Sequence, residues 1–278
     1  MPRPGTARAP RPTIRSVSTS AIVVAHPGHE LRVFHWMERV RPLYCCLTEG
    51  SGGTGSSRMP STDVVLERVG SRSGPIYGRY SDKEVYRLLL AGRTDVFVAL
   101  AEELADLFVS AGIDEVAGDA VEGFNPSHDV CRFVIDGAVA LASLRTGRPI
   151  DNRDFVLEAR PDACPEASRD AAAWLRLDEA ALDRKIDAAL QYPELRPEVH
   201  AALERYGRGA FAVECLRPVT TALMLDALDG ELPFYERYGE QRVRDGRYAE
   251  IIRYRQHVLP VRTAIEAAVH GQTVDAVC

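Results

Sequence analysis

Two short apolar runs near the start of the chain predict the first structural elements. Residues 20–25 read Ser-Ala-Ile-Val-Val-Ala, and residues 43–48 read Leu-Tyr-Cys-Cys-Leu-Thr. Continuous apolar runs of this length, bounded by loop-forming residues, are typical of strands buried on both faces of a parallel sheet. We therefore predict two buried strands, the first of which ends in a loop that begins with Pro27.

Apolar positions elsewhere recur at helical spacing. A short amphipathic helix is predicted over 31–40, and Ser81 and Glu84 have the spacing of a capping box that begins another helix. Further elements are predicted as helices over 96–111, ended by Gly112, and over 129–144, with a strand over 113–117 between them.

The alternation of strands and helices predicts the fold class. Through about residue 160 the order is that of an α/β protein with a Rossmann-like, mostly parallel sheet and helices on both faces. Beyond that point the pattern changes to helix upon helix, notably over 177–190 and 235–257. We expect three parts: a disordered tail (1–18), an α/β domain that carries the candidate site (19–160), and a C-terminal helical extension packed on it (161–278).

Composition narrows the class of protein. Of the 278 residues, 46% are hydrophobic and 27% are charged, the balance of a globular chain with a substantial core. The net charge is −6 and the basic residues are dispersed, so we expect no nucleic acid partner. We expect no membrane span, because no apolar run approaches ~20 residues. The N-terminus lacks the apolar segment of a secretory signal, and the six cysteines read as buried free thiols, so we expect a cytoplasmic protein.

The candidate chemistry lies in loops that follow strands, where open parallel sheets collect their ligands. His26 and His29 follow the first predicted strand, and His128 stands in a second such loop, just before a predicted helix. Three neutral imidazoles with an open position for water form a common catalytic site for Zn²⁺, and they suit Fe²⁺ or Co²⁺ as well. Such an ion would lower the pKa of water and polarise a substrate carbonyl.

The placement of these histidines carries more weight than their spacing. A His-x-x-His pair in a loop is weak evidence by itself, but its position after a buried strand, with a second loop histidine available, strengthens the interpretation. The remaining histidines stand in helical or C-terminal contexts, and we interpret them as surface or packing residues: His35, His200, His257 and His270.

Residues 25–30, Ala-His-Pro-Gly-His-Glu, and 125–128, Asn-Pro-Ser-His, resemble the two motifs of the PIG-L (LmbE-like) family of metal-dependent N-deacetylases. The family's motifs are Ala-His-Pro-Asp-Asp-Glu after the first strand and His-Pro-Asp-His before a helix, and the resemblance covers roughly residues 19–150. It implies that His26, His29 and His128 hold the metal ion, with a histidine in place of the family's second aspartate. It also implies a substrate that is an N-acylated sugar.

Two positions depart from the family's pattern. The family's general base is the first aspartate of the first motif, and the matching residue is Gly28, which cannot accept a proton. The first histidine of the second motif, which helps to stabilise the oxyanion, is matched by Asn125, whose amide still donates hydrogen bonds. Glu30 and Asp129 each adjoin a proposed ligand, so either is a candidate for the missing base or for a residue that orients a histidine.

Two arginines near the motifs are the candidate substrate-binding residues. Arg58 ends a Gly/Ser-rich segment that lacks the Walker pattern and stands where the family has a loop leading to an arginine near the substrate. It is expected either to hold a sugar hydroxyl or a phosphate or to lie in solvent. Arg32 is similarly placed, as are Asp119 and Glu122. The aromatic run at 234–238 reads as core packing or as a platform for a sugar.

Together these features favour a zinc-type hydrolase that removes an N-acyl (acetyl) group from an amino sugar or a sugar-containing metabolite. The alternative is a homologue that binds a metal or a small ligand without hydrolysis, because Gly28 replaces the base. A third interpretation is different metal chemistry on the same scaffold in a biosynthetic pathway.

Overall fold

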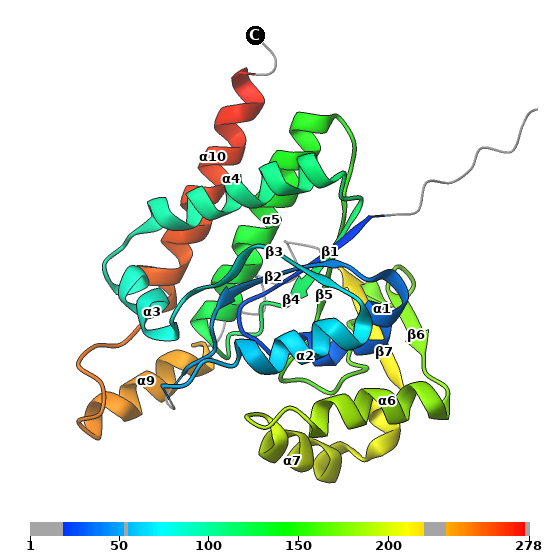
Figure 1. Ribbon diagram of the computed structural model, residues 1–278. Coiled ribbons are helices and arrows are strands. Elements are labelled where there is room, and N and C mark those ends of the chain that lie inside the picture. The colour runs from blue at the N-terminus through cyan, green and yellow to red at the C-terminus, as the bar shows by residue number, and fades with distance from the viewer. Residues whose placement is uncertain (1–18, 53–54, 220–231, 276–278) are drawn as a thin grey trace, which may run out of the picture.

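A seven-stranded sheet forms the centre of the molecule (Figure 1). The computed structural model describes residues 19–52, 55–219 and 232–275. The strands lie in the order β3-β2-β1-β4-β5-β7-β6. All neighbouring pairs from β3 to β5 are parallel, whereas β7 pairs antiparallel with both β5 and β6. The bounds are β1 Ser20–Val24, β2 Leu43–Thr48, β3 Arg72–Tyr80, β4 Glu115–Asp119, β5 Asp151–Phe155, β6 Ala173–Arg176 and β7 Val213–Pro218.

Helices cover both faces of the sheet, which confirms the predicted fold class. Because side chains alternate along a strand, Ala21 and Val23 of β1 pack into one core, and Ile22 and Val24 pack into the other. The first core is closed by α3 (Asp82–Leu90), α4 (Thr94–Ala111), α5 (Pro126–Thr146), α9 (Phe234–Arg244) and α10 (Leu259–Asp275). The second is closed by η1 (His29–Val33), α1 (Phe34–Val40), α2 (Met59–Val69) and α6 (Glu179–Leu190), and α7 (Arg196–Tyr206) follows α6.

Local sequence signals determine where several helices begin and end. The Ser81 hydroxyl accepts a hydrogen bond from the Glu84 N–H at 3.2 Å, and Glu84 accepts one from the Ser81 N–H at 2.7 Å, so the predicted capping box is present. Gly112 ends α4 in the left-handed conformation, as predicted. α5 begins three residues earlier than predicted, because Asn125 caps it.

The region after residue 160 requires a correction, because it is not purely helical. β6 and β7 come from this region and extend the same sheet. Both strands are short and pair with segments distant in the sequence, so local periodicity does not reveal them. The predicted helix over 235–257 is interrupted as well: α9 ends before Gly246, and η4 (Tyr254–Val258), a π-helix, leads into α10. The predicted tail over 1–18 lies outside the described residues.

Among the described residues, the cysteines are free thiols, as expected. The free cysteines are Cys45, Cys46, Cys131 and Cys215, which are buried, and Cys164, which is half-buried; Cys278 lies outside the described residues. Within the described ranges, no helix combines the length and the apolar character that a membrane crossing demands.

A buried ion pair connects α6 and β7 to the helical segments η1 and α1, which follow the loop of the first motif. Lys185 of α6 donates to Glu214 of β7 at 2.8 Å and to the main-chain oxygen of Arg32 at 2.7 Å. The Glu214 carboxylate in turn accepts from the main-chain N–H groups of His35 and Trp36, at the start of α1. Both charged side chains are almost fully buried. Each charge therefore depends on the other, since an unpaired charge in a protein interior is costly.

We expect Lys185→Met to lower the free energy of unfolding by about 3–5 kcal/mol, because it leaves the Glu214 carboxylate buried without its cation. Arg184→Met is the matched control on the same helix, since the Arg184 side chain is 53% exposed in its pair with Glu38, and such pairs contribute below ~1 kcal/mol. Urea unfolding of both variants measures the difference. Equal losses would show that the buried pair does not stabilise the fold.

Candidate metal centre

The three predicted ligands come together at the edge of the sheet where the parallel strands end. His26 lies in the loop after β1, His29 begins η1, and His128 lies in the first turn of α5. Their ring centroids are 5.2 Å apart for His26 and His29, 4.9 Å for His26 and His128, and 4.6 Å for His29 and His128. Residues separated by about a hundred positions in the sequence thus form one compact imidazole cluster.

Carboxylates orient two of the three rings. Nδ1 of His26 lies 2.8 Å from Asp82 and 2.7 Å from the Thr48 hydroxyl. Nδ1 of His29 lies 3.0 Å from both carboxylate oxygens of Asp119. A ring that donates its Nδ1–H to a carboxylate keeps Nε2 unprotonated, which is the form of a metal-ligating histidine. The contacts therefore assign this tautomer to both rings.

Two ring nitrogens of the cluster are buried without a hydrogen-bond partner in the protein: Nε2 of His26 and Nδ1 of His128. Burial lowers the pKa of His26 against the opposing bond to Asp82. Burial, followed by repulsion from His29 and His26, holds the pKa of His128 well below its usual value. Both shifts favour the neutral imidazole, which is the form that binds a metal ion.

The donor set and the ring spacing fit a divalent ion. An ion bound tetrahedrally to imidazole nitrogens at ~2.0–2.1 Å holds their ring centroids about 5 Å apart, close to the separations found here. In the described part of the chain, however, no group of three or more His, Cys, Asp and Glu side chains is already arranged to hold an ion. Ligation would therefore require the rings to turn until three nitrogens converge.

Asp119 and Asp82 are the residues that sequence reasoning underestimated. The sequence places Asp119 near the motifs and gives it no defined role. In the structure it ends β4, is completely buried, and also accepts from the main-chain N–H of Ala25 at 2.8 Å. Asp82, the first residue of α3, carries no motif, although its position just after β3 is a signal. Its burial would raise the pKa, but the bond from His26 and its other donors outweigh this and lower the pKa to about 2.

The contacts of Glu30 are those of a residue that stabilises the loop after β1. Its carboxylate is completely buried and accepts hydrogen bonds from the Gly28 N–H at 2.7 Å, the Thr62 hydroxyl at 2.9 Å and the Tyr44 hydroxyl at 3.1 Å. Burial raises its pKa, and these donors act against that shift. With both oxygens occupied, Glu30 holds the loop of the first motif in shape.

Asp129 and Asn125 both shape the second loop. One oxygen of Asp129 accepts from the N–H groups of Glu122 and Gly123, each at 3.2 Å, while the other is buried without a partner in the protein. Burial raises the pKa of Asp129 to about 7. The Asn125 side-chain oxygen accepts from the Ser127 N–H at 2.9 Å and so caps α5. Asn125 therefore fixes the start of the helix that carries His128.

The two candidate arginines have different surroundings. Arg58 is half-buried just before α2, and its side-chain methylene lies beside Gly50, whose other neighbour is Pro27 of the first motif. Burial lowers the pKa of Arg32, and nearby Glu122 opposes this shift; one of its guanidinium nitrogens is buried without a partner in the protein. Glu122 also accepts from main-chain N–H groups after β5, such as that of Leu157 at 2.7 Å.

The side chain of Leu195 covers Gly28 in the loop after β1. Gly28 has a φ of 102°, and a Cβ atom built on it would lie 2.2 Å from Cδ1 of Leu195. Leu195 stands in the connection between α6 and α7, together with Tyr192, whose hydroxyl contacts Thr62 at 3.0 Å and donates to the Arg58 main-chain oxygen at 3.2 Å. A side chain at position 28 would therefore require the Leu195 side chain to shift, and it would also strain the left-handed backbone.

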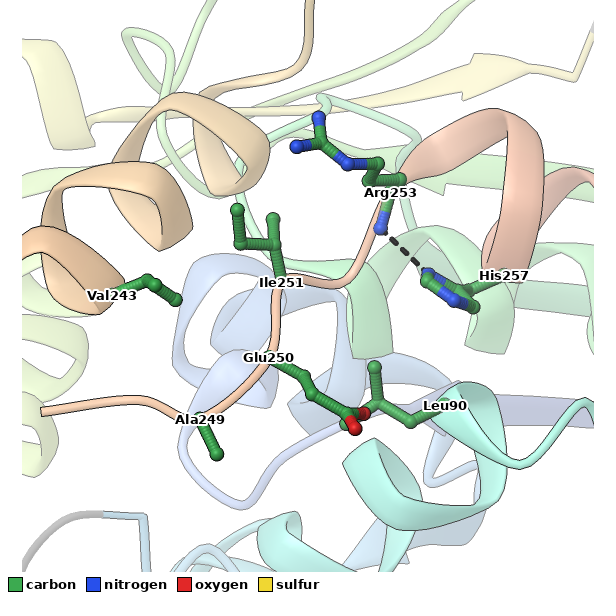
Figure 2. A pocket seen from close by; sticks show the side chains of 7 residues that line it. All are labelled: Leu90, Val243, Ala249, Glu250, Ile251, Arg253 and His257. Carbon is green, nitrogen blue, oxygen red and sulfur yellow. Dashed lines mark hydrogen bonds between the residues drawn. The ribbon is translucent and has the colours of Figure 1, made fainter.

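A separate cavity of about 300 Å³ lies away from the histidine cluster. Figure 2 shows its lining, with a hydrogen bond from the Arg253 main-chain N–H to Nδ1 of His257, 2.8 Å long. The lining residues are Leu90, Val243, Ala249, Glu250, Ile251, Arg253 and His257. None of them is a predicted site residue, so this cavity does not belong to the metal centre.

The arrangement defines an α/β protein with a Rossmann-like sheet and a histidine cluster at its carboxyl edge, and solved structures share this fold. The A40926 pseudoaglycone deacetylase Dbv21 is similar with 16% identity, a TM-score of 0.50 and coverage of 74% of this chain and 98% of that chain. A triple mutant of the deacetylase Orf2 of the teicoplanin biosynthetic pathway is similar with 14% identity, a TM-score of 0.52 and coverage of 73% and 98%. A structure described as the zinc-inhibited form of teicoplanin deacetylase Orf2 has 13% identity, a TM-score of 0.50 and the same coverage.

At these identities the similarity establishes the fold alone. No family model and no curated protein sequence matches the chain. The chemistry of the site must therefore be argued from its own residues.

We expect Gly28→Ala to destabilise the protein by about 2–4 kcal/mol, because the new methyl group meets Leu195 and the backbone is left-handed. Gly112→Ala is the control: its φ is also positive, at 64°, but nothing lies within 4 Å of the added atom, so about 1 kcal/mol is expected. Adding Leu195→Ala should recover part of the Gly28→Ala loss in a double-mutant cycle of urea unfolding. Strict additivity would show that the two side chains do not compete for space.

Proposed function

We propose that this chain is a divergent PIG-L-like hydrolase that uses a divalent metal ion to remove an N-acyl group from an amino sugar or a sugar-containing metabolite. The observation that carries the proposal is the cluster of three imidazoles, two of them oriented through Nδ1 by Asp82 and Asp119. Buried carboxylate–histidine pairs of this kind are characteristic of metal sites. The resemblance of the motifs and the description of similar structures as deacetylases support the acyl substrate.

Each residue has a defined task in this proposal. His26, His29 and His128 would hold the ion, which when bound supplies Lewis acidity toward a carbonyl and acidifies water. The side-chain oxygen of Asn125 is used by the helix cap, so its amide N–H side is the part that can donate to a developing oxyanion. Arg58, at the rim of the first motif, would bind a sugar hydroxyl or a phosphate.

Asp129 is the better of the two candidates for proton transfer. Glu30 has both oxygens engaged by donors, whereas one oxygen of Asp129 has no partner in the protein. A general base needs a free lone pair within reach of the proton that it takes. We therefore assign proton transfer to Asp129 and the shaping of the loop to Glu30.

The position of the Leu195 side chain over Gly28 favours a second candidate function, which is binding without hydrolysis. Where the resembling family has its base, this chain has a glycine under Leu195. A protein that binds a metal ion and an acylated small molecule without turnover would need no base there. The two functions share the metal centre and differ only in the release of the acyl product.

Metal analysis tests the centre. We expect the purified protein to hold about one divalent ion per chain, and His26→Ala, His29→Ala and His128→Ala each to lose it. Exposed His200→Ala is the matched control and should keep the ion. Asp119→Asn should weaken binding by about 10–100-fold. A protein without bound metal, or loss in the control as well, would refute the centre.

Acetate release decides between the two functions. We expect the protein loaded with Zn²⁺, Co²⁺ or Fe²⁺ in parallel to release acetate from N-acetylglucosamine or its methyl glycoside. Asp129→Asn should lower kcat by about 100-fold or more if Asp129 transfers the proton. Tight binding of the glycoside to the metal-loaded protein, without acetate release for any of the three ions, would favour the non-hydrolytic binder.

A further inference from the structure

A row of four aromatic side chains extends from the loop of the second motif along α9. Phe124 and Phe234 stack with centroids 4.8 Å apart and planes inclined by 4°. Phe234 stacks on Tyr238 at 5.7 Å, and Tyr238 meets Tyr248 edge to face at 6.5 Å. We call Phe124, Phe234, Tyr238 and Tyr248 the aromatic row.

The aromatic row is open to solvent. Its members are between 37% and 43% exposed. Among the described residues, the other exposed large aromatic side chain is Trp174 on β6, which stands outside the row. Exposed apolar side chains are ordinary when scattered, whereas a contiguous group marks a binding surface.

The aromatic row does not belong to the hydrophobic core, because α9 packs on the core through other residues. α9 already packs its other face, since Tyr235 is 7% exposed and Glu236 is 3% exposed. The Glu236 carboxylate accepts from the Tyr254 N–H at 2.7 Å, which fixes the helix to the following segment. Phe234 and Tyr238, four positions apart, lie next to each other on the helix surface and are 43% and 38% exposed. Of the two interpretations of the aromatic run at 234–238, core packing therefore applies to Tyr235. It does not apply to the rings of Phe234 and Tyr238.

The aromatic row begins four residues before His128 in the sequence. Phe124 directly precedes Asn125, the cap of α5, and His128 lies in the first turn of that helix. α9, orange in Figure 1, lies at the end of the sheet from which α5 starts. A molecule whose amide reached the histidine cluster could thus extend its remaining part along the row.

The chemistry of the aromatic row selects a planar aromatic occupant. Aromatic rings prefer partners that stack with an offset or approach edge to face, as these four already do with one another. The Arg242 guanidinium lies 4.7 Å from the Tyr238 ring centroid and adds a further planar group. A sugar would need convergent polar groups beside the rings for its hydroxyls. A second copy of the chain is a poor fit, because four rings of this exposure offer on the order of 300 Å², against about 800 Å² per partner in a stable interface.

We propose that the aromatic row is a subsite for a planar aromatic group carried by the substrate, adjacent to the acyl group that is removed. The inference rests on the proposed function for the identity of the reacting group. The binding of the aromatic group itself does not depend on turnover, and this allows the two to be tested separately.

The test compares three N-acetylglucosamine β-glycosides that differ only in the aglycone: methyl, cyclohexyl and 4-methylumbelliferyl. Calorimetry on the metal-loaded protein gives Kd, and acetate release gives kcat/KM. We expect the planar aryl glycoside to bind at least about 10-fold more tightly than the methyl glycoside, with the cyclohexyl glycoside close to methyl. Phe234→Ala and Tyr238→Ala should each weaken aryl binding by about 3- to 10-fold.

Two further variants control for folding and for general loss of apolar surface. Phe234→Leu keeps apolar volume but removes the ring, so it should lose most of the aryl preference. Trp174→Ala removes an aromatic side chain of similar exposure on β6 and should keep the wild-type preference. Equal Kd values for the aryl and methyl glycosides, or a cyclohexyl glycoside that binds as tightly as the aryl one, would overturn the proposal. So would a concentration-dependent dimer that Phe234→Ala dissolves.

The outcomes separate this inference from the proposed function. If the aryl glycoside binds through the aromatic row and no acetate appears, the subsite stands and the hydrolase falls. If all three glycosides lose acetate with equal kcat/KM and equal Kd, the hydrolase stands and the subsite falls.

Discussion

The carboxylate of Asp119 is the contact on which the arrangement of the histidine cluster depends. It ends β4 in the middle of the sheet, accepts from the main-chain N–H of Ala25 at the end of β1, and contacts Nδ1 of His29. One completely buried carboxyl group thus joins two neighbouring strands to a candidate ligand. Because an unpaired buried carboxylate is costly, the loop after β1 cannot move without a loss of stability. The same contact that stabilises the fold therefore positions the imidazole.

The connection between α6 and α7 packs directly against Gly28 of the first motif. Leu195 occupies the space that any side chain at position 28 would need. A carboxylate at position 28 would therefore require a shift of the Leu195 side chain as well as a change of the glycine itself. A hydrolase built in this way must take its proton acceptor from elsewhere, and a binding protein would have no need of one.

The sequence predicts those parts of the fold that local patterns determine. β1 and β2 are apolar runs, and the capping box of α3 and the glycine that ends α4 involve residues only a few positions apart. β6 and β7 are not predicted, because their stability comes from pairing across the sheet. In the site, the three histidines could be found from their loops. Asp82, the partner of His26, carries no motif, and its position after β3 is a signal only once β3 is known to belong to the same parallel sheet as β1.

The histidine cluster and the residues around it come from different parts of the chain. The histidines and their carboxylates lie before residue 130, whereas Leu195 and most of the aromatic row come from the region after residue 160. The buried pair of Lys185 and Glu214 connects that region to η1 and α1, next to the first motif. Substitutions in the later region can therefore change which molecule reaches the histidines while the ligands stay in place. The three histidines and the side chain that covers Gly28 are therefore supplied by separate parts of the chain.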